Sequence, residues 1–401
     1  MTSDLPKLLY IGDVPVEASY HGSALLYRLL GGYPVDRLRI IEGNLDQSLP
    51  ERRLKNVPYG SLRVGRSRLL RTRFRSAVSS CLTLAATGNR RQVQGLCDDF
   101  TPEAILTVAH GYSWMAAAAF ATKKGLPLHL IVHDDWPRMA RLPAPMMRWL
   151  AGKFQTTYRQ ASTRLCVSPY MVEEYRSRYG VEGSLLYPSR AADVPQFDSP
   201  PERLAEQERP LVFAFGGTIN TGGHVNALRK LAAALLPHGA ILNLYGPISD
   251  DAAKSAGLNS SNIRLCGLVP SEQFVTRIRQ EADVLFVPMS FAAKDVDNMS
   301  LLFPSKLTDY TAAGLPLLIS GPSYSSAVRW AKDHPNVAVV LESESTEEVA
   351  VVVEKLLADP SLRVSLASNA IRVGQQLFSH AAIQKEFYDA LRSKGSSGIG
   401  V

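Results

Sequence analysis

The sequence predicts an α/β protein with two domains, each built around a parallel sheet. Short β-rich apolar runs alternate with longer helical patterns along all 401 residues, as in sheets made of βαβ units. Residues 188–210 interrupt this alternation with five prolines and mixed charges, which is typical of a linker. The length also suits two or three domains, and we expect two of similar size.

Each domain is expected to contain six strands. In the first domain they cover residues 8–12, 38–41, 104–108, 128–132, 164–167 and 184–187. In the second they cover residues 211–215, 240–245, 263–266, 284–287, 315–320 and 337–341. We place the domains at 1–190 and 210–375, with a linker at 191–209 and a C-terminal segment at 376–401. This last segment holds an amphipathic helix that we expect to pack back on the first domain, followed by a frayed tail.

The composition is that of an ordinary globular protein, with 46% hydrophobic and 20% charged residues. No run of about 18 apolar residues occurs, and the N-terminus enters a strand without a signal-type apolar region. We therefore expect a cytoplasmic protein. The four cysteines are widely spaced and form no CxxC pair, which predicts neither a disulfide framework nor a zinc knuckle. They are Cys81, Cys97, Cys166 and Cys266.

The net charge of +7 comes from one segment. Residues 52–75 contain nine Lys or Arg and no acid, so the remainder is close to neutral. Leu70, Phe74, Ala77, Val78 and Cys81 fall at helical spacing, while other positions hold Arg66, Arg68, Arg71, Arg73 and Arg75. This pattern predicts an amphipathic basic helix whose partner is an anionic membrane surface, worth about 1 kcal/mol per cation. The alternative is a basic face that is merely solvated. A nucleic-acid partner is not expected, because the arginines are accompanied neither by a series of aromatic residues that could stack on bases nor by a known nucleic-acid-binding motif.

Residues 303–316 place a cation, a carboxylate and a helix start close together. Pro304 suits the first turn of a helix, Ser305 suits its exposed amides, and a glycine suits its end. The N-terminus of such a helix, with Lys306 beside it, attracts an anion. One turn later, Asp309 can accept hydrogen bonds from ribose hydroxyls. The alternative is an ordinary capped surface helix with both charges solvated.

A glycine-rich turn follows the first strand of the second domain, at Gly216, Gly217 and Thr218. Without Cβ atoms the two glycines permit close approach of a phosphate or sugar, and a helix starting near His224 supplies exposed amides. The turn matches neither GxGxxG nor GxxxxGK[ST], so no dinucleotide fingerprint or P-loop is present. A plain tight turn is the alternative.

In the first domain, His133 ends a predicted strand, where ligand chemistry is expected in parallel sheets. Its imidazole can contact a sugar hydroxyl or offset developing charge, and a structural hydrogen-bonding role is the alternative. His110 ends the preceding strand and is the second choice. The loop after the first strand ends at His21, and Gly22 opens a helix there, a geometry that suits an acceptor or a diphosphate.

A metal is not expected. Asp295 and Asp297 match a DxD pattern, but two acids at that spacing are common and their neighbours suggest a polar loop. Histidines and cysteines are nowhere clustered at transition-metal spacing along the sequence. A GxSxG nucleophile motif is also absent.

The layout resembles a glycosyltransferase of the GT-B fold, in particular the large retaining group, family 4-like, that includes bacterial lipopolysaccharide, capsule and mannoside transferases. The resemblance covers nearly the whole chain and is most specific in residues 282–321. There, residues 282–288, 303–306 and 309–316 are similar to the donor-binding core of that group. It implies two Rossmann-like, doubly wound parallel-sheet domains facing across a cleft, the first binding the acceptor and the second the nucleotide sugar.

The same resemblance assigns residues. Asp309 matches the acid that binds the donor ribose, Ser305 and Lys306 lie beside the donor diphosphate, and His133 corresponds to a histidine that contacts the donor sugar. The glycine turn with Thr218 also lies near the diphosphate. We place His133 and Lys306 in catalysis, and the acceptor beside His21, Gly22, His110 and Asp134.

Three positions depart from that pattern. Asp309 replaces the usual glutamate, Leu301 replaces the first acid of a glutamate pair, and the glycine turn lacks the usual arginine and lysine. Asn298, Met299 or Ser300 is then expected near the donor sugar, and Lys306 is expected to supply most of the charge facing the phosphates.

We therefore expect a retaining, metal-independent hexosyltransferase that uses a UDP-, GDP- or TDP-sugar. Its acceptor would be a lipid-linked sugar or a polysaccharide in bacterial cell-surface glycan synthesis, at the inner face of the membrane. Two alternatives stay open: a non-catalytic subunit that keeps the fold, and a nucleotide-sugar 2-epimerase, which the few carboxylates around His133 and His110 disfavour.

Overall fold

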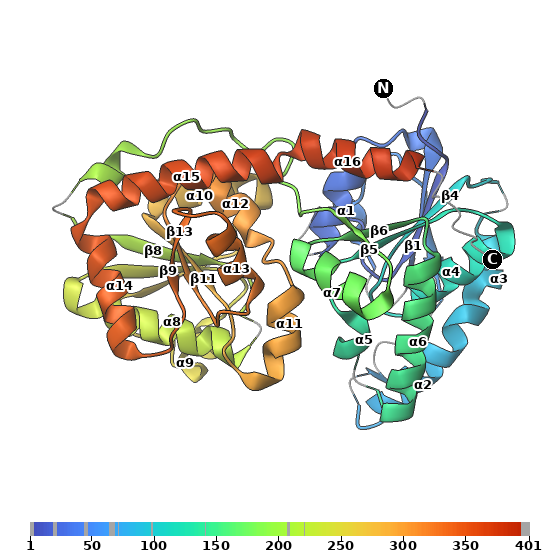
Figure 1. The fold of residues 1–401 in the computed structure, drawn as a ribbon, viewed down its shortest axis with the longest axis horizontal. Helices are drawn as coiled ribbons and strands as arrows, with labels where there is room; N and C mark the ends of the chain where they lie inside the picture. Colours follow the sequence, from blue (N-terminus) through green and yellow to red (C-terminus); the bar gives the residue numbers. More distant parts are fainter. Residues whose placement is uncertain are drawn as a thin grey trace. The chain divides into compact units, whose positions relative to one another are not determined.

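In a computed structural model the chain forms two compact units (Figure 1). The first contains residues 1–189 and returns with residues 380–401, and the second contains residues 190–379. The structure describes residues 4–18, 22–43, 47–63, 69–70, 72–97, 99–140, 142–206, 209–219 and 221–393. Three functional candidates from the basic segment, Arg66, Arg68 and Arg71, and the acceptor candidate His21 lie outside these residues.

The first unit is built on a seven-stranded parallel sheet. Its order is β3-β2-β1-β4-β5-β6-β7, so the strand order reverses direction between β1 and β4. The strands are β1 (Leu8–Gly12), β2 (Leu38–Gly43), β3 (Tyr59–Leu62), β4 (Ala104–Val108), β5 (Leu128–Val132), β6 (Thr163–Cys166) and β7 (Ser184–Leu185). The six strands expected from the sequence are present, and β3 is an additional edge strand.

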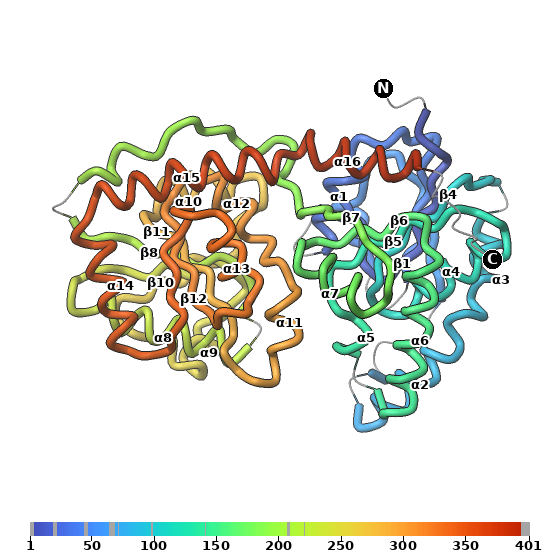
Figure 2. The backbone as a smooth tube through the Cα atoms, in the orientation of Figure 1, coloured from blue at the N-terminus to red at the C-terminus, as the bar shows by residue number. Residues whose placement is uncertain are grey.

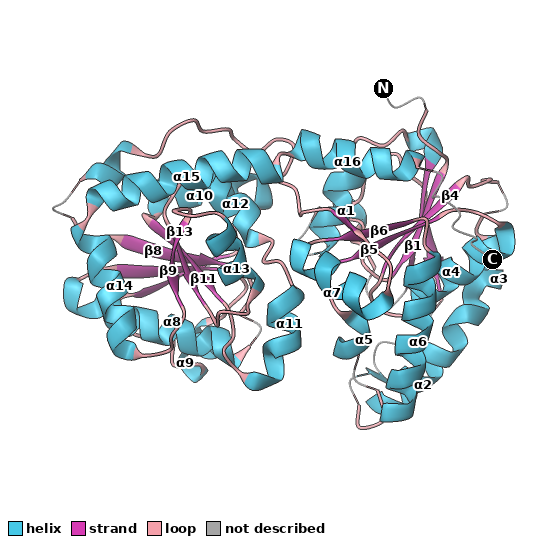
Figure 3. Ribbon diagram, viewed as in Figure 1, coloured by secondary structure: helices cyan, strands magenta, loops and turns pink. Residues whose placement is uncertain are grey.

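Helices cover the strands of this sheet (Figure 3). They are α1 (Gly22–Leu30), α2 (Arg75–Ala85), α3 (Arg90–Gly95), α4 (Ser113–Lys124), α5 (Trp136–Met139), α6 (Ala144–Gln160), α7 (Pro169–Tyr179) and α16 (His380–Arg392). Alternate residues of β1, such as Leu9 and Ile11, join Phe120 of α4 and Val93 of α3 in one core cluster. Because side chains alternate along a strand, this places α3 and α4 on one face of the sheet.

The C-terminal helix α16 belongs to the first unit and lies beside α1 (Figure 2). The rings of Tyr33 and Tyr388 meet edge to face, with centroids 5.7 Å apart. Arg392 pairs with Asp4 near the start of the chain, at 2.9 Å between Nε and Oδ2. Helix α16 therefore packs on the same unit that contains β1, although the whole second unit lies between them in the sequence.

The predicted basic amphipathic helix is wrong in two respects. The helix α2 begins at Arg75 rather than near Leu70, so Arg73 precedes it. Its buried residues are Ser79 and Thr83, not the expected apolar set, and Phe74 is 57% exposed. Polar side chains can face inward here because Thr83 Oγ1 donates to the carbonyl of Ser79 at 2.6 Å, which satisfies the hydroxyl within the helix.

The second unit has a six-stranded parallel sheet of order β10-β9-β8-β11-β12-β13, which reverses direction between β8 and β11. The strands are β8 (Val212–Gly216), β9 (Ile241–Tyr245), β10 (Ile263–Gly267), β11 (Val284–Pro288), β12 (Leu317–Ser320) and β13 (Ala338–Leu341). These are the six strands expected from the sequence. The residues expected to be a linker contain the short helix η5 (Glu202–Ala205), and its Leu204 is fully buried in this unit.

Two groups of helices enclose this sheet. They are α8 (Gly222–Leu235), α9 (Asp250–Ser255), α10 (Ser271–Glu281), α11 (Val296–Leu301), α12 (Lys306–Ala313), α13 (Ser326–Asp333), α14 (Thr346–Ala358) and α15 (Pro360–Phe378). Phe213 and Phe215 of β8 share a core cluster with α8 and α14, whereas α12 packs against α10 and α15. No described helix has the length and apolar character needed to cross a membrane.

Candidate functional site

The two sheets each have one point where the strand order reverses, and such points are where open parallel sheets bind ligands. In the second unit the point lies between β8 and β11, and β8 ends at Gly216. In the first unit it lies between β1 and β4, and β4 is followed by His110. Gly216 ends β8, His110 follows β4, and His133 follows the neighbouring strand β5.

The glycine turn after β8 is held by backbone contacts from both sides. Gly217 has φ of +124° and donates from its N–H to the carbonyl of Tyr245 at 2.8 Å. A side chain on Gly216 would overlap the ring of Phe274, and one on Gly246 would overlap the carbonyl oxygen of Gly217. Larger residues would therefore displace this turn, which explains its glycines.

Helix α12 is tied to the same turn. The backbone N–H of Gly216 donates to Tyr310 Oη at 2.6 Å, and Tyr310 is fully buried. Sequence reasoning missed Tyr310, because its partner lies 94 residues away in the chain. The tyrosine fixes the distance between the glycine turn and the helix that carries Lys306.

Lys306 is the first residue of α12 and points at the glycine turn. Its Nζ lies 4.0 Å from the centroid of the Phe215 ring, and a Cβ on Gly217 would stand 3.8 Å from the same atom. Burial lowers the pKa of Lys306 to about 7. Among the described residues no carboxylate pairs with this ammonium group. A cation in that setting is suited to a bound anion.

The helix start differs in detail from the expectation. Ser305 occupies the cap position with helical φ and ψ, and its side chain caps no amide, so its predicted capping role is wrong. Asp309 lies in the first turn of α12, three residues after Lys306, and is partly exposed. Gly314 ends the helix with φ of +64°, as the sequence predicted.

Arg190, the first residue of the second unit, places a positive charge near Asp309. Arg190 is buried and donates to the carbonyl of Thr308 and to Thr311 Oγ1, both at 3.3 Å. Burial lowers the pKa of Arg190 to about 10, and the nearby Asp309 opposes that shift. Arg190 was not singled out from the sequence; it braces the middle of α12.

The segment after β11 lies close to the start of α8. Ser290 Oγ donates to Asp295 Oδ2 at 2.6 Å, and a side chain on Gly223 would collide with Ser290. The amide oxygen of Asn298 is buried without a hydrogen-bond partner in the described structure, and Ser300 Oγ donates to the carbonyl of Asp297 at 3.0 Å. The expected polar loop at the DxD pattern is wrong, because these residues form η7 (Ala293–Asp295) and α11.

Three side chains meet at the carboxyl ends of β4 and β5. His133 Nε2 lies 3.1 Å from Asp134 Oδ2, His110 Nδ1 lies 3.4 Å from the same oxygen, and the two ring nitrogens are 3.4 Å apart. The pKa of Asp134 is well below its usual range: burial would raise it, and the contacts with His133 and His110 outweigh burial. The structure thus unites three residues that the sequence only placed on neighbouring loops.

The next residue anchors this loop. Asp135 is buried and accepts hydrogen bonds from Tyr175 Oη at 2.9 Å and from Arg178 Nη1 at 2.9 and 3.0 Å. Trp136 packs on the ring of His110, with centroids 4.4 Å apart. The backbone after β5 is therefore fixed by a buried ion pair on one side and a ring contact on the other.

The loop after β1 is organised by buried carboxylates that sequence reasoning missed. Asp13 accepts from the backbone N–H and the hydroxyl of Ser113 at 2.7 and 2.6 Å, at the start of α4. Glu42 accepts from the N–H of Val16 at 2.7 Å. Gly22, the acceptor candidate, lies against His133: a Cβ there would stand 2.7 Å from Cε1.

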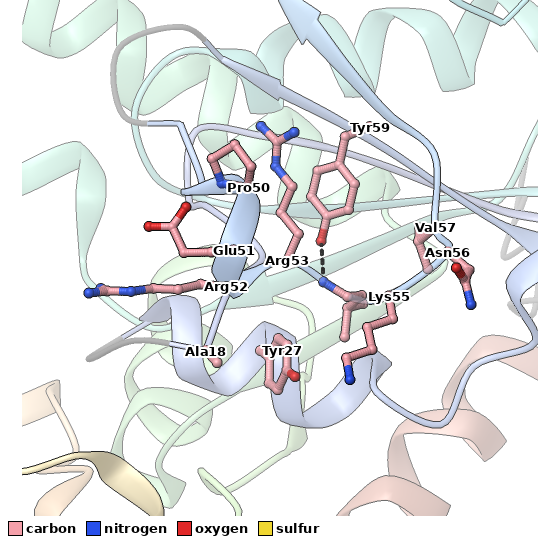
Figure 4. Close-up of a pocket in the computed structure, with 11 residues that line it drawn as sticks. Ala18, Tyr27, Pro50, Glu51, Arg52, Arg53, Lys55, Asn56, Val57 and Tyr59 are labelled. Atoms are coloured by element: carbon pink, nitrogen blue, oxygen red, sulfur yellow. Dashed lines mark hydrogen bonds between the residues drawn. The ribbon is translucent and has the colours of Figure 1, made fainter.

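A cavity of about 430 Å³ opens beside α1, and Figure 4 shows its lining. Tyr59 Oη accepts from the N–H of Leu54 and donates to the carbonyl of Val16 at 2.8 Å, while Arg53 stacks on the Tyr59 ring. Arg52 and Lys55 also line the cavity, are exposed, and have no ion-pair partner among the described residues. Glu51 lines the cavity as well, so three cations and one carboxylate face it, and the excess of positive charge favours an anionic group.

The two parallel sheets, each with its reversal point, define a protein of the GT-B fold, as predicted. Over 97% of this chain and 100% of the other, the structure is similar to HepE from Anabaena in complex with UDP-glucose, with a TM-score of 0.69 at 14% identity. The chain is also similar to sucrose-phosphate synthase from Thermosynechococcus elongatus, with a TM-score of 0.68 at 12% identity, over 96% of this chain and 98% of the other. The similarity to the lipopolysaccharide outer core galactosyltransferase WaaB has a TM-score of 0.59 at 14% identity, over 96% of this chain and 99% of the other.

Sequence comparison supports the same class over part of the chain. Residues 46–187, within the first unit, match the family model described as Glycosyltransferase Family 4. A search of curated protein sequences found no match to the chain.

Proposed function

We propose that this protein is a glycosyltransferase that transfers a sugar from a nucleotide-sugar donor. The observation that carries the proposal is Lys306, a poorly solvated cation at a helix start, aimed at a glycine turn where the strand order reverses. Diphosphates bind at such places because backbone amides and a fixed cation offset their charge. HepE, a structure of the same fold, was solved with UDP-glucose.

In this proposal the second unit holds the donor. Gly216, Gly217, Thr218, Ser305 and Lys306 would surround the diphosphate, and Asp309 would accept hydrogen bonds from the ribose. The sugar would lie toward α11, near Ser300 and near Asn298, whose buried amide oxygen has no hydrogen-bond partner in the described structure. Because Lys306 and the helix ends carry the leaving diphosphate, we propose that transfer needs no metal.

The first unit would hold the acceptor near His110, Asp134, Gly22 and His21. His133 would contact the transferred hexose, and its orientation is set by Asp134 at 3.1 Å. We propose a lipid-linked or polysaccharide acceptor of the bacterial cell surface and a retaining reaction. The fold is shared with WaaB, a lipopolysaccharide galactosyltransferase, and the cations beside α1 suit an anionic acceptor.

Association with the inner face of the membrane is proposed from the surface around α2. Phe74 and Leu84 are 57% and 55% exposed, and Arg73 and Arg75 lie beside Phe74 in the basic segment. Exposed apolar side chains next to cations are typical of surfaces that bind anionic lipid headgroups. The proposed membrane contact therefore rests on these exposed side chains around α2, and not on the amphipathic basic helix expected from the sequence.

One observation favours a second candidate, a binding subunit without activity. Leu301 stands where the resemblance places the first acid of a pair, and it is only 5% exposed, so that position is apolar and filled. Such a subunit would bind a nucleotide sugar without turning it over.

Calorimetry with UDP-, GDP- and TDP-sugars tests the proposal. We expect one sugar nucleotide to bind, and Lys306→Met to weaken it by about 10- to 100-fold, the cost of losing a charge-assisted contact. Lys332→Met is the matched control, because Lys332 pairs with Glu342 on the surface of the same unit. Absence of binding by every donor would refute the proposal. Binding without slow donor hydrolysis or transfer would instead support the inactive subunit.

A further inference from the structure

The triangle formed by His110, His133 and Asp134 has the dimensions of a metal site. Its ligand atoms are His110 Nδ1, His133 Nε2 and Asp134 Oδ2, and its sides are 3.1, 3.4 and 3.4 Å. In the part of the chain that the structure describes, this is the one group of three or more such residues with metal-holding geometry. Sequence spacing gave no sign of it, because His110 lies 23 residues before His133.

The sides of the triangle match tetrahedral coordination. Zinc binds imidazole nitrogen and carboxylate oxygen at about 2.0 to 2.1 Å, and two ligands at the tetrahedral angle are then about 3.4 Å apart. An ion on the open side of these three atoms can therefore reach all of them without movement of the backbone. We infer that His110, His133 and Asp134 bind a divalent transition-metal ion such as Zn²⁺ through three protein ligands.

The donor set selects the kind of metal. Two imidazoles and one carboxylate suit Zn²⁺, Co²⁺ or Ni²⁺, whereas Mg²⁺ and Ca²⁺ prefer oxygen ligands alone. The side chains are 36%, 14% and 18% exposed for His110, His133 and Asp134, so solvent reaches one side of the triangle. A water molecule or a substrate oxygen can complete the coordination there.

The site is held in place before any ion binds. Val108 of β4 lies opposite Ile131 of β5 in the sheet. His110 and His133 each come two residues after one of these paired positions, so they leave the sheet side by side. Asp135 fixes the backbone beside Asp134 through Arg178. Ligands on neighbouring strand ends with a braced loop lose little entropy on metal binding.

Metal binding has a consequence for the proposed transferase, and this step rests on the function proposed above. The ion occupies His133 Nε2 and Asp134 Oδ2, so it replaces the contact by which Asp134 orients the imidazole proposed to face the hexose. A bound transition metal therefore inhibits transfer, although transfer itself uses no metal. Through the His133 imidazole, the activity of the protein would then depend on the availability of zinc.

Binding is tested first, without any donor. Untagged protein freed of metal by a chelator is titrated with Co²⁺, whose visible absorption reports ligand number and geometry, and with Zn²⁺ by calorimetry in the presence of excess Mg²⁺. We expect one equivalent and a tetrahedral or five-coordinate cobalt spectrum. His110→Ala and Asp134→Asn should each weaken binding at least about 100-fold, more than the 10- to 100-fold lost with an outer-sphere partner.

The control is His238→Ala, which removes an exposed histidine of the second unit and should leave affinity unchanged. Circular dichroism and thermal unfolding show whether each variant is folded; the conservative His110→Gln serves if the alanine variant is not. Absence of stoichiometric binding, or equal affinity in the double variant His110→Ala/Asp134→Asn, would overturn the inference and leave a hydrogen-bonded cluster.

Inhibition is tested second, with the donor and acceptor that give turnover or, failing an acceptor, with donor hydrolysis. Zinc at one equivalent should abolish at least nine-tenths of the rate, and a chelator should restore it. Full activity of the zinc-loaded protein would overturn the inhibitory role. A protein that binds zinc as described but no sugar nucleotide would refute the proposed function and leave the metal site standing.

Discussion

Gly216 and Tyr310 are joined by a hydrogen bond of 2.6 Å from the glycine N–H to the tyrosine oxygen. The bond links the end of β8 to the middle of α12, so the glycine turn and the Lys306 helix move as one body. An anion that touches both would find its ligands already placed, which lowers the ordering cost of binding.

Tyr310→Phe should therefore loosen the donor site. Loss of the hydroxyl leaves the buried N–H of Gly216 unsatisfied, which costs about 1 to 3 kcal/mol. We expect a lower unfolding midpoint and a donor affinity reduced several-fold. The matched control is Tyr245→Phe, since Tyr245 Oη donates to Glu281 at 2.6 Å in the same unit. If both variants bind donor equally well, the bond does not hold the site.

Removal of Lys306 should stabilise the protein in a pH-dependent way. The folded pKa of about 7 lies below the unfolded value of about 10.4, so between these values the unfolded state binds more protons and stability rises with pH. Lys306→Met removes that penalty, which we expect to be on the order of 2 kcal/mol at pH 6. The advantage should shrink toward pH 10 in urea unfolding. A constant difference from pH 6 to 10 would contradict the lowered pKa.

Donor binding should draw a proton onto Lys306. A diphosphate beside the ammonium favours its charged form, so the pKa rises on binding and affinity falls as pH increases above about 7. Calorimetry at pH 8, with the sugar nucleotide that binds and in buffers of different ionisation enthalpy, should show uptake of close to one proton. Lys306→Met should show none. Equal heats in all buffers for the unaltered protein would exclude this coupling.

Two glycine-to-alanine changes in helices should have opposite signs. Gly374 lies within α15, and a Cβ there would overlap Arg190 and Thr311, so Gly374→Ala should destabilise by about 1 to 3 kcal/mol. Gly152 lies within α6, and no atom of the described residues lies within 4 Å of an added Cβ, so Gly152→Ala should stabilise by about 0.5 to 1 kcal/mol. Thermal unfolding measures both. A stabilised Gly374→Ala protein would mean that Arg190 does not pack on this helix.

The surface around α2 should bind anionic vesicles. We expect sedimentation with vesicles containing phosphatidylglycerol and none with neutral phosphatidylcholine, decreasing with salt. The double variant Arg73→Glu/Arg75→Glu and the single variant Phe74→Ser should both bind more weakly. Arg176→Glu is the charge control, because Arg176 is an exposed residue of α7 in the same unit. Equal binding to both lipids would remove the membrane proposal.

The strands and the glycine turn could be predicted because they depend on local patterns. Phe213 and Phe215 alternate with small residues, and Gly314 supplies the left-handed end of α12. Asp13 and Arg190 could not be predicted, since their partners Ser113 and Thr311 lie 100 and 121 residues away. Helical spacing of apolar residues also misled the interpretation of α2, where Ser79 and Thr83 are buried instead.

The return of α16 to the first unit has a consequence for synthesis. Helix α16, which completes the first unit, emerges from the ribosome only after roughly 190 residues of the second unit, about 10 to 40 s after the preceding part of the first unit at usual translation rates. During that interval α1 lacks the neighbour that covers it. The nascent chain therefore presents an apolar surface to chaperones until residues 380–392 are made, and truncation before residue 380 would leave that surface uncovered.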